Sequence, residues 1–403
     1  MRRTFALAAM MHFAVACSAG VVPDEGGREN RPVGPAETAT PSPGQGDSKV
    51  PAAAATIRVH YPAGSQAIGL RGEGGSLPAD KSTPMTAAAD DTWELALGAI
   101  EQPVHFTPML GDKPARGPSY KVLPGQTVDV YPYFIATKGT VAERWPKFES
   151  KARGNTRVIR TYVPPSYEEN TRKRYPVVYM HDGQYLFTGS TLASKTECLL
   201  VEKTLDEGIE AGTIAETIIV GIDSSPLTRM TELTPTKDGI QGGGGGPDYV
   251  KMMADELKPR VDAELRTLPD RDHTFTMGQS LGGLASAFAS IARPEVFGGF
   301  ASQSPSYWWD DRIIIGQAKT AFASAPRASK IYVDYGDKET IEPDMTSKLI
   351  EPVNEFLGTV RDAGYVDDKD LLFVLGPSPA EHKATSWAPR MPKALTFLVG
   401  AGR

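Results

Sequence analysis

A Gly-x-Ser-x-Gly motif, formed by Gly278, Ser280 and Gly282, holds the residues best suited to nucleophilic chemistry. A serine hydroxyl becomes a useful nucleophile when a base lies beside it. A β-type run precedes the motif and small, helix-compatible residues follow it, which predicts a tight strand-to-helix turn. Glycines flank the serine because a Cβ would not fit where strand and helix crowd together. The N–H of Leu281, at the helix N-terminus, is then placed to donate to an oxyanion.

The base for such a serine is expected further along the chain. Around nucleophile elbows of this kind the order is serine, acid, histidine. Of the six histidines, only His382 follows Ser280. It lies in a loop between the last predicted strand and the last predicted helix. We therefore predict His382 as the general base.

Three carboxylates compete for the role of the acid that orients this histidine. Asp334, Asp337 and Glu339 all lie at or just after the predicted strand 330–335. A glycine, Gly336, marks the turn, and a residue just beyond a turn can reach back over the sheet. Spacing leaves the three open. We choose Glu339, with Asp337 second and Asp334 third.

A second oxyanion donor is predicted after an earlier strand. The predicted strand 175–180 leads into His181, Asp182, Gly183 and Gln184. The loop at this place supplies a backbone N–H in folds that carry a nucleophile elbow. We predict the N–H groups around Gly183 and Gln184 as donors. Two interpretations of Asp182 stay open: it forms the turn, or it has a catalytic role.

Aromatic and glycine-rich segments complete the candidate site. Tyr307, Trp308 and Trp309 follow a strand beside the motif, where they would line a substrate pocket or pack in the core. The run 241–247 is rich in glycine but lacks the Gly-Lys-Ser/Thr ending of a phosphate loop. We read it as a flexible surface loop. No spacing suggests a metal site, and the chemistry requires no cofactor.

The elements that position these residues follow the rhythm of an α/β protein from residue 157 onwards. Buried apolar strands that alternate with helices predict a mostly parallel sheet covered on both faces. The strands are predicted at 158–163, 175–180, 217–222, 274–277, 298–303, 330–335 and 371–375, and helices at 248–265, 344–362 and 388–399.

A smaller β-rich module precedes this domain. Short alternating runs at 56–61, 92–97, 104–109 and 127–134 predict an immunoglobulin-like β-sandwich over residues 55–135. Trp93 in such a strand is expected in the core, although it could stack on a sugar. Residues 136–156 are charged and irregular, and we interpret them as a linker to the domain at 157–403.

The N-terminus resembles an export signal. Arg2 and Arg3 precede an apolar stretch at 5–16, and we interpret residues 1–17 as a signal peptide. The stretch ends at Cys17 in a sequence similar to a bacterial lipoprotein box, with Ala14 where leucine is usual. The alternative is an ordinary signal peptide without lipidation. Residues 18–54 contain few large apolar side chains and predict a disordered tether.

Bulk composition excludes several classes of protein. A net charge of −6 argues against a nucleic-acid binder, which usually shows a basic excess. Two cysteines exclude a disulfide scaffold. No apolar run reaches the ~18 residues that a transmembrane helix needs.

Several stretches of the second domain resemble the enterochelin-esterase-like branch of the α/β-hydrolases, also called the esterase D family. The matching stretches are 175–184, 229–235, 278–283, 302–309 and 381–387. The resemblance implies an α/β-hydrolase fold with Ser280 as nucleophile and His382 as base. It favours a Gly-x-x-Glu form of the acid, hence Glu339. It also implies that Arg229 and Glu232 are structural or shape the pocket.

These observations predict an exported serine esterase that works through an acyl-enzyme. Members of the resembled family act on siderophore trilactones, on feruloyl or acetyl esters of polysaccharides, or on small thioesters. The expected partner is a small-molecule or polysaccharide ester, with substrate contacts from Trp308, Trp309 and Arg229. A lipidated Cys17 would anchor the protein to the cell envelope. The alternatives are an acyltransferase with the same triad and a non-catalytic glycan-binding lipoprotein.

Overall fold

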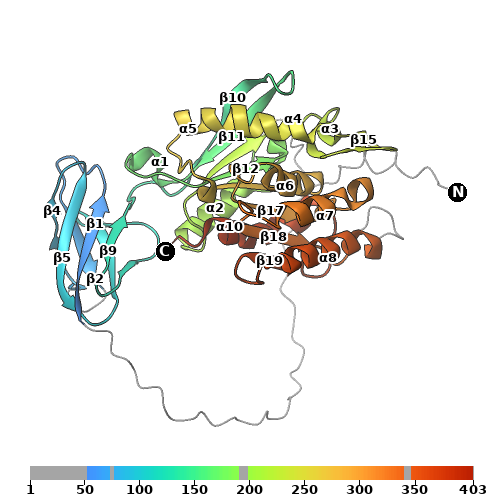
Figure 1. The fold of residues 1–403 in the computed structure, drawn as a ribbon. Helices are drawn as coiled ribbons and strands as arrows, with labels where there is room; N and C mark the ends of the chain where they lie inside the picture. The colour runs from blue at the N-terminus through green and yellow to red at the C-terminus, as the bar shows by residue number, and fades with distance from the viewer. Residues whose placement is uncertain (1–51, 73–76, 190–197, 340–345, 403) are drawn as a thin grey trace, which may run out of the picture.

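The computed structural model describes residues 52–72, 77–189, 198–339 and 346–402. The predicted signal peptide, with Cys17, and most of the predicted tether lie outside these ranges. A small β-rich module, blue to cyan in Figure 1, adjoins a larger domain that extends to the C-terminus. No helix of the described residues is long and apolar enough to cross a membrane.

The larger domain contains an eight-stranded sheet. Its first two neighbouring pairs, β10–β11 and β11–β13, are antiparallel, and every later pair is parallel. The prediction of a mostly parallel sheet is confirmed. In spatial order the strands are β10 (Thr140–Ser150), β11 (Asn155–Val163), β13 (Ile218–Ile222), β12 (Val177–His181), β16 (Thr274–Gln279), β17 (Gly299–Gln303), β18 (Lys330–Tyr335) and β19 (Leu371–Leu375).

Helices cover both faces of this sheet because its strands are apolar on both sides. Tyr179 and Val220 pack into one core, while their neighbours Val178 and Ile219 pack into the other, as the period of two along a strand requires. The first core is shared with α4 (Gly246–Lys251), η2 (Met252–Leu257), α5 (Lys258–Glu264), α6 (Leu281–Ala292), α7 (Trp309–Ala321) and α8 (Thr346–Asp362). The second is shared with α2 (Val201–Glu210) and α10 (Met391–Val399).

The prediction of a linker over 136–156 is wrong for most of its length. Residues 140–150 form β10, which pairs with β11 at the edge of the central sheet. Trp145 and Phe148 anchor the strand in the core of the larger domain, with exposed fractions of 5% and 3%. The register shifts on both sides of Trp145 break the period of two, so the sequence lacked the alternation that indicates a strand.

The β-rich module consists of two sheets around a core of its own. Trp93 is half-buried and packs against this core. The immunoglobulin-like assignment stays a prediction. One sheet has the order β4 (Thr86–Ala87), β5 (Thr92–Ile100), β1 (Ala53–His60) and β9 (Thr127–Val130). The other has the order β3 (Thr83–Pro84), β2 (Ile68–Gly72), β6 (Val104–Leu110) and β7 (Lys113–Pro114), with β8 (Tyr120–Val122) paired to β6.

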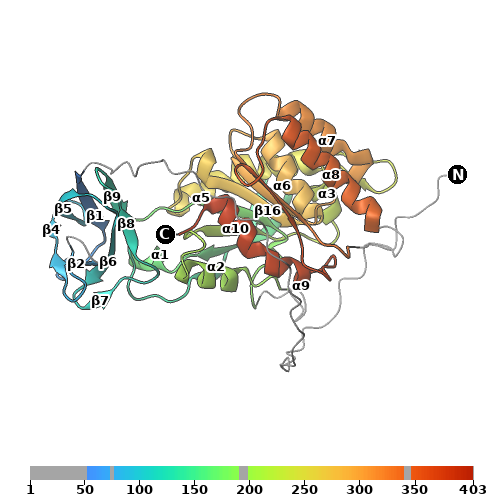
Figure 2. The same cartoon turned by 90° about the horizontal axis from the view of Figure 1, so that it is seen from below.

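The module is fastened to the larger domain through α1 (Ser166–Glu169) (Figure 2). The Glu169 carboxylate accepts backbone N–H groups from residues 134–136 and the hydroxyl of Tyr61. α1 follows Val163, and β11 runs antiparallel to β13. The module therefore docks at the edge where the parallel strands begin, opposite the edge that carries the carboxyl ends of those strands.

Candidate active site

Ser280 lies between β16 and α6, as the motif predicts. Its backbone has φ 58° and ψ −122°, a sparsely populated conformation for a residue with a side chain. A Cβ on Gly278 would lie 2.6 Å from the carbonyl carbon of Gly282, so the turn tolerates only glycine there. The Ser280 hydroxyl is 3.4 Å from the hydroxyl of Ser306. The strained turn raises the serine at the carboxyl edge of the sheet.

The predicted oxyanion donors lie on two neighbouring loops. β12 and β16 are paired in parallel, so their ends meet at the same edge. A Cβ on Gly282 would be 3.3 Å from the Cβ of His181, which places the elbow against the loop after β12. In that loop Gln184 belongs to the short helix η1 (Gly183–Tyr185), and Leu281 is the first residue of α6. Their role as oxyanion donors remains a prediction.

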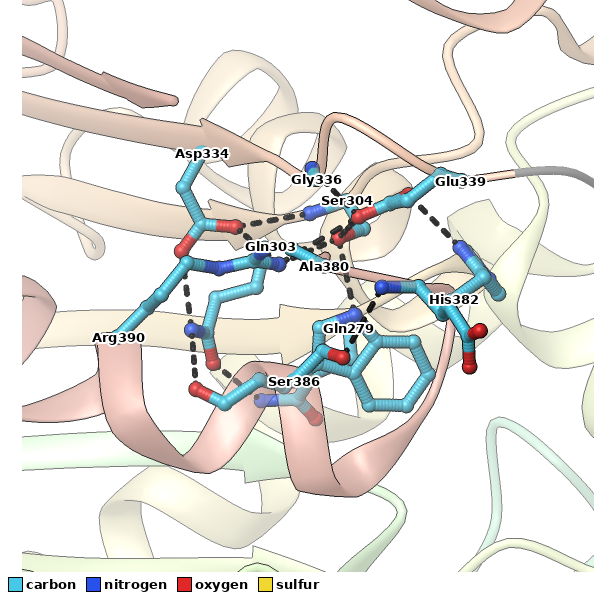
Figure 3. A network of polar contacts seen from close by, with 12 residues as sticks. Gln279, Gln303, Ser304, Asp334, Gly336, Glu339, Ala380, His382, Ser386 and Arg390 are labelled. Atoms are coloured by element: carbon cyan, nitrogen blue, oxygen red, sulfur yellow. Dashed lines mark hydrogen bonds and ion pairs between the residues drawn. The ribbon is translucent and has the colours of Figure 1, made fainter. Parts of the chain in front are cut away.

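His382 and Glu339 are joined by a hydrogen bond. The distance between His382 Nδ1 and Glu339 Oε2 is 3.0 Å, and Figure 3 shows the two side chains facing each other. Glu339 is fully buried, whereas the His382 side chain keeps 21% of its surface exposed. A buried carboxylate on Nδ1 fixes the imidazole so that Nε2 remains for another partner.

The segment that follows β17 connects this pair to the serine. The Ser280 N–H donates to the carbonyl of Gln303, and the Ser306 N–H donates to the carbonyl of Ser280. Between them, the hydroxyl of Ser304 donates to Glu339. Within the described residues, the structure has no hydrogen bond between Ser280 and His382. Such bonds often tighten only when a substrate binds.

The two competing acids have other partners. Asp337 accepts the N–H of Ala380 at 2.8 Å, and hydrogen bonds from Ser378 and from that N–H lower its pKa. Asp334 is fully buried and accepts Gln303, Tyr332 and Arg390. Burial raises the pKa of Asp334 to about 6, although Arg390 opposes that shift. Of the three carboxylates, the structure places Glu339 on His382.

Asp182 forms a buried ion pair. Its carboxylate accepts two N–H groups from one edge of the Arg229 guanidinium, with Arg229 Nε at 2.8 Å and Nη2 at 2.8 Å, and also accepts the hydroxyl of Ser224. Burial alone would raise the pKa of Asp182, but Arg229 and these hydrogen bonds outweigh it and hold the pKa below its usual value. Arg229 begins α3 (Arg229–Leu233). The pair braces the loop after β12, and the prediction that Arg229 contacts substrate stays a prediction.

His181, next to this pair, is an uncharged buried histidine. Its Nδ1 lies 2.9 Å from the hydroxyl of Tyr249, and its Nε2 has no hydrogen-bond partner among the described residues. Burial lowers the pKa of His181 to about 4, and Arg229 adds to that effect, against the attraction of Asp182. No role is predicted for this histidine from the sequence. The only indication in the sequence is the position of His181 between the predicted strand 175–180 and Asp182.

The predicted aromatic contacts divide into a core residue and a half-buried one. Trp309 is 1% exposed and donates its indole N–H to the carbonyl of Thr236 at 3.0 Å, so the expectation that it contacts substrate is corrected. It packs against Gly243 of a small hairpin, β14 (Lys237–Asp238) and β15 (Gly242–Gly243). Within the glycine-rich run 241–247, Gly242 and Gly243 therefore form a strand of this hairpin and Gly246 begins α4, so the run is only in part the predicted loop. Trp308 is half-buried.

Residues 150–398 match the sequence profile of the family described as "Esterase: Putative esterase". The chain belongs to this esterase family. The match covers the central sheet from β11 onwards with its helices, and it leaves the β-rich module and nearly all of β10 outside. It makes the protein a carboxylic ester hydrolase of the serine hydrolase type. No group of three or more His, Cys, Asp or Glu side chains in the described ranges is placed to hold a metal ion.

Two curated relatives of this esterase are siderophore esterases. The iron(III) salmochelin esterase of Escherichia coli is 30% identical over 158 residues, which are 39% of this chain and 34% of that protein. The siderophore triacetylfusarinine C esterase of Aspergillus fumigatus is 26% identical over 210 residues, 49% of this chain and 69% of the fungal protein. Only about a third of the bacterial relative is thus matched.

The fold of this esterase is similar to that of a solved ferulic acid esterase. The two structures superimpose with a TM-score of 0.51 at 18% sequence identity. The superposition covers 65% of this chain and 98% of the other. At this level of identity the likeness concerns the fold.

Proposed function

We propose that this esterase hydrolyses carboxylic esters through an acyl-enzyme on Ser280, with His382 as base and Glu339 as the acid that orients it. The observation that carries the proposal is the hydrogen bond between the buried Glu339 carboxylate and His382. Residues 303–306, which follow β17, contact both Glu339 and the strained Ser280. This is the constellation that activates a serine hydroxyl.

The proposed reaction proceeds in two steps. Ser280 Oγ forms a bond to the ester carbonyl carbon while His382 Nε2 takes the hydroxyl proton. The bond to the alcohol oxygen then breaks, and the imidazolium returns the proton to the leaving alcohol. Water attacks the acyl-enzyme in the same way and releases the acid and the free serine. The N–H groups of Leu281 and Gln184 stabilise the oxyanion in both steps.

The proposed substrate is a siderophore ester or an acyl ester of a polysaccharide. The names of the two siderophore esterases among the relatives support the first class. The fold shared with a ferulic acid esterase agrees with the second. Turnover of a hydroxamate or catecholate siderophore ester, measured beside a feruloylated oligosaccharide, separates the two.

A fluorophosphonate probe and p-nitrophenyl acetate test the mechanism. Wild type and Ser280→Ala are compared as purified proteins beginning at residue 50. We expect the wild type to be labelled and to show turnover, and both signals to disappear in Ser280→Ala. A folded wild type that takes no label would contradict the proposal.

We further propose that the protein is exported and held at the cell envelope through Cys17. Arg2, Arg3 and the apolar stretch at 5–16 support export, and the cysteine after Ala14–Ala16 supports lipidation. The full chain and its Cys17→Ser variant are expressed with labelled palmitate. Label in both proteins, or in neither, would contradict lipidation at Cys17.

A further inference from the structure

A buried polar network lies behind the His382–Glu339 pair (Figure 3). Ser304, Asp334, Trp387 and Arg390 are each at most 4% exposed. Ser304 follows β17, Trp387 ends α9 (Ala384–Trp387), and Arg390 ends η4 (Ala388–Arg390). Of these four, only Asp334 is a candidate from the sequence, as the third choice of acid. Two of the family-like stretches, 302–309 and 381–387, contain Ser304 and Trp387.

The Ser304 hydroxyl has its hydrogen-bonding capacity fully used. Its oxygen accepts the indole N–H of Trp387 at 2.9 Å and a guanidinium N–H of Arg390 at 2.7 Å. A hydroxyl has two acceptor sites and one proton, so both acceptor sites are occupied. The proton is therefore directed to its remaining partner, Oε1 of Glu339.

The Glu339 carboxylate is thereby divided into two differently engaged oxygens. Oε1 accepts Ser304, the N–H of Gly336 at 2.7 Å and, more distantly, Arg390 at 3.5 Å. Oε2 accepts His382. Because Oε1 is held on one side, the carboxylate presents Oε2 to the imidazole. Charge-assisted hydrogen bonds of this kind are strong and directional.

The backbone of Ser304 shows that the hydroxyl is retained at some conformational disadvantage. Its φ is 45°, in the left-handed region that favours glycine. Its N–H is tied to Asp334 of the neighbouring strand. A glycine would adopt this backbone conformation more easily but would lack the hydroxyl. Serine at this position therefore lowers stability relative to glycine and keeps the hydroxyl.

We propose that Ser304 is a positioning residue that orients the Glu339 carboxylate toward His382, with Trp387 and Arg390 fixing the direction of its hydroxyl. The proposal rests on the proposed function of Ser280, Glu339 and His382. Trp387 has a second contact with the site, because its ring meets the His382 ring edge-on with centroids 5.0 Å apart.

The test uses two substitutions with opposite effects on the backbone. Ser304→Ala removes the hydroxyl and keeps a Cβ at positive φ, whereas Ser304→Gly removes the hydroxyl and relieves the backbone. We expect both to lower kcat for p-nitrophenyl acetate by about 10- to 100-fold with KM unchanged, because a misplaced catalytic group has effects of this size. Ser304→Gly should unfold at the same or a higher temperature than Ser304→Ala. Ser290→Ala, which removes an equally buried hydroxyl bound to a backbone carbonyl, is the matched control.

A double-mutant cycle shows whether Ser304 acts through Glu339. In the Glu339→Ala background we expect Ser304→Ala to cause no further loss in the rate of acylation. An equal further loss there, or a kcat within threefold of wild type for both Ser304 variants, would overturn the positioning role. Turnover that survives Ser280→Ala would overturn the proposed nucleophile instead, so the two failures are distinguishable. Trp387→Phe keeps an aromatic ring, although a smaller one, and removes the N–H, and we expect a smaller loss of kcat from it.

Discussion

Two buried carboxylates, Asp182 and Glu339, lie on different loops after strands of the central sheet, and their partners differ. Asp182 is saturated by Arg229 and Ser224, which bind both of its oxygens. Glu339 is held at one oxygen and offers the other to a histidine. A carboxylate locked in a bidentate ion pair stays charged and braces a loop. One with a free oxygen can stabilise a cation that forms and disappears during turnover. The comparison separates a carboxylate held in an ion pair, Asp182, from the proposed catalytic acid, Glu339.

The largest expected effect concerns the catalytic carboxylate. Glu339→Gln should lower kcat by about 10⁴-fold, because an amide can present N–H to Nδ1 and favour the wrong imidazole tautomer. The measurement is steady-state hydrolysis of p-nitrophenyl acetate, and Asp337→Asn is the matched control. A greater loss in Asp337→Asn than in Glu339→Gln would transfer the acid role to Asp337.

Substitution of Asp182 should mainly lower the stability of the fold. Asp182→Asn leaves Arg229 as an unpaired charge in a largely buried site, and we expect the free energy of unfolding to fall by about 3–5 kcal/mol. Denaturant unfolding at neutral pH measures this change. Ser280 in the fraction that remains folded should still react with the fluorophosphonate probe. An unchanged stability with abolished labelling would make Asp182 the catalytic partner in this comparison.

His181 should make the braced loop sensitive to acid. The native state keeps this histidine neutral down to its pKa of about 4, whereas the unfolded chain takes up the proton near 6.5. The unfolded state therefore binds more protons in this window, and stability falls as the pH is lowered from 6.5 to 4, by about 3 kcal/mol from this group. Unfolding curves at both pH values, for wild type and His181→Gln, test this. Equal pH dependence in the two proteins would contradict it.

The smallest expected effect comes from Arg229→Lys. Lysine keeps the charge but loses the bidentate pair of hydrogen bonds to Asp182, so we expect a loss of about 2 kcal/mol in stability. KM for ester substrates should stay within threefold of wild type if Arg229 acts on the loop alone. A large rise in KM with unchanged stability would support the prediction that Arg229 binds substrate.

The fold was predictable where apolar residues alternate with turn signals. Each predicted strand of the larger domain after residue 157 appears in the central sheet, because runs such as 217–222 are apolar on both faces. β10 was missed since its bulges destroy the alternation around Trp145. Trp309 was left open between pocket and core because its neighbour across the fold, Gly243, lies far away in the sequence.

By itself the sequence determined the nucleophile motif, the candidate base and the order of both along the chain. Chain order and local turn chemistry are properties of neighbouring residues, so they can be read from the sequence. Spacing left Asp334, Asp337 and Glu339 open, and the family resemblance favoured Glu339, but only the tertiary structure shows which of them contacts His382. These three carboxylates lie within six residues of one another. They differ in partners that come from distant segments: Arg390 for Asp334, Ala380 for Asp337, and Ser304 with His382 for Glu339.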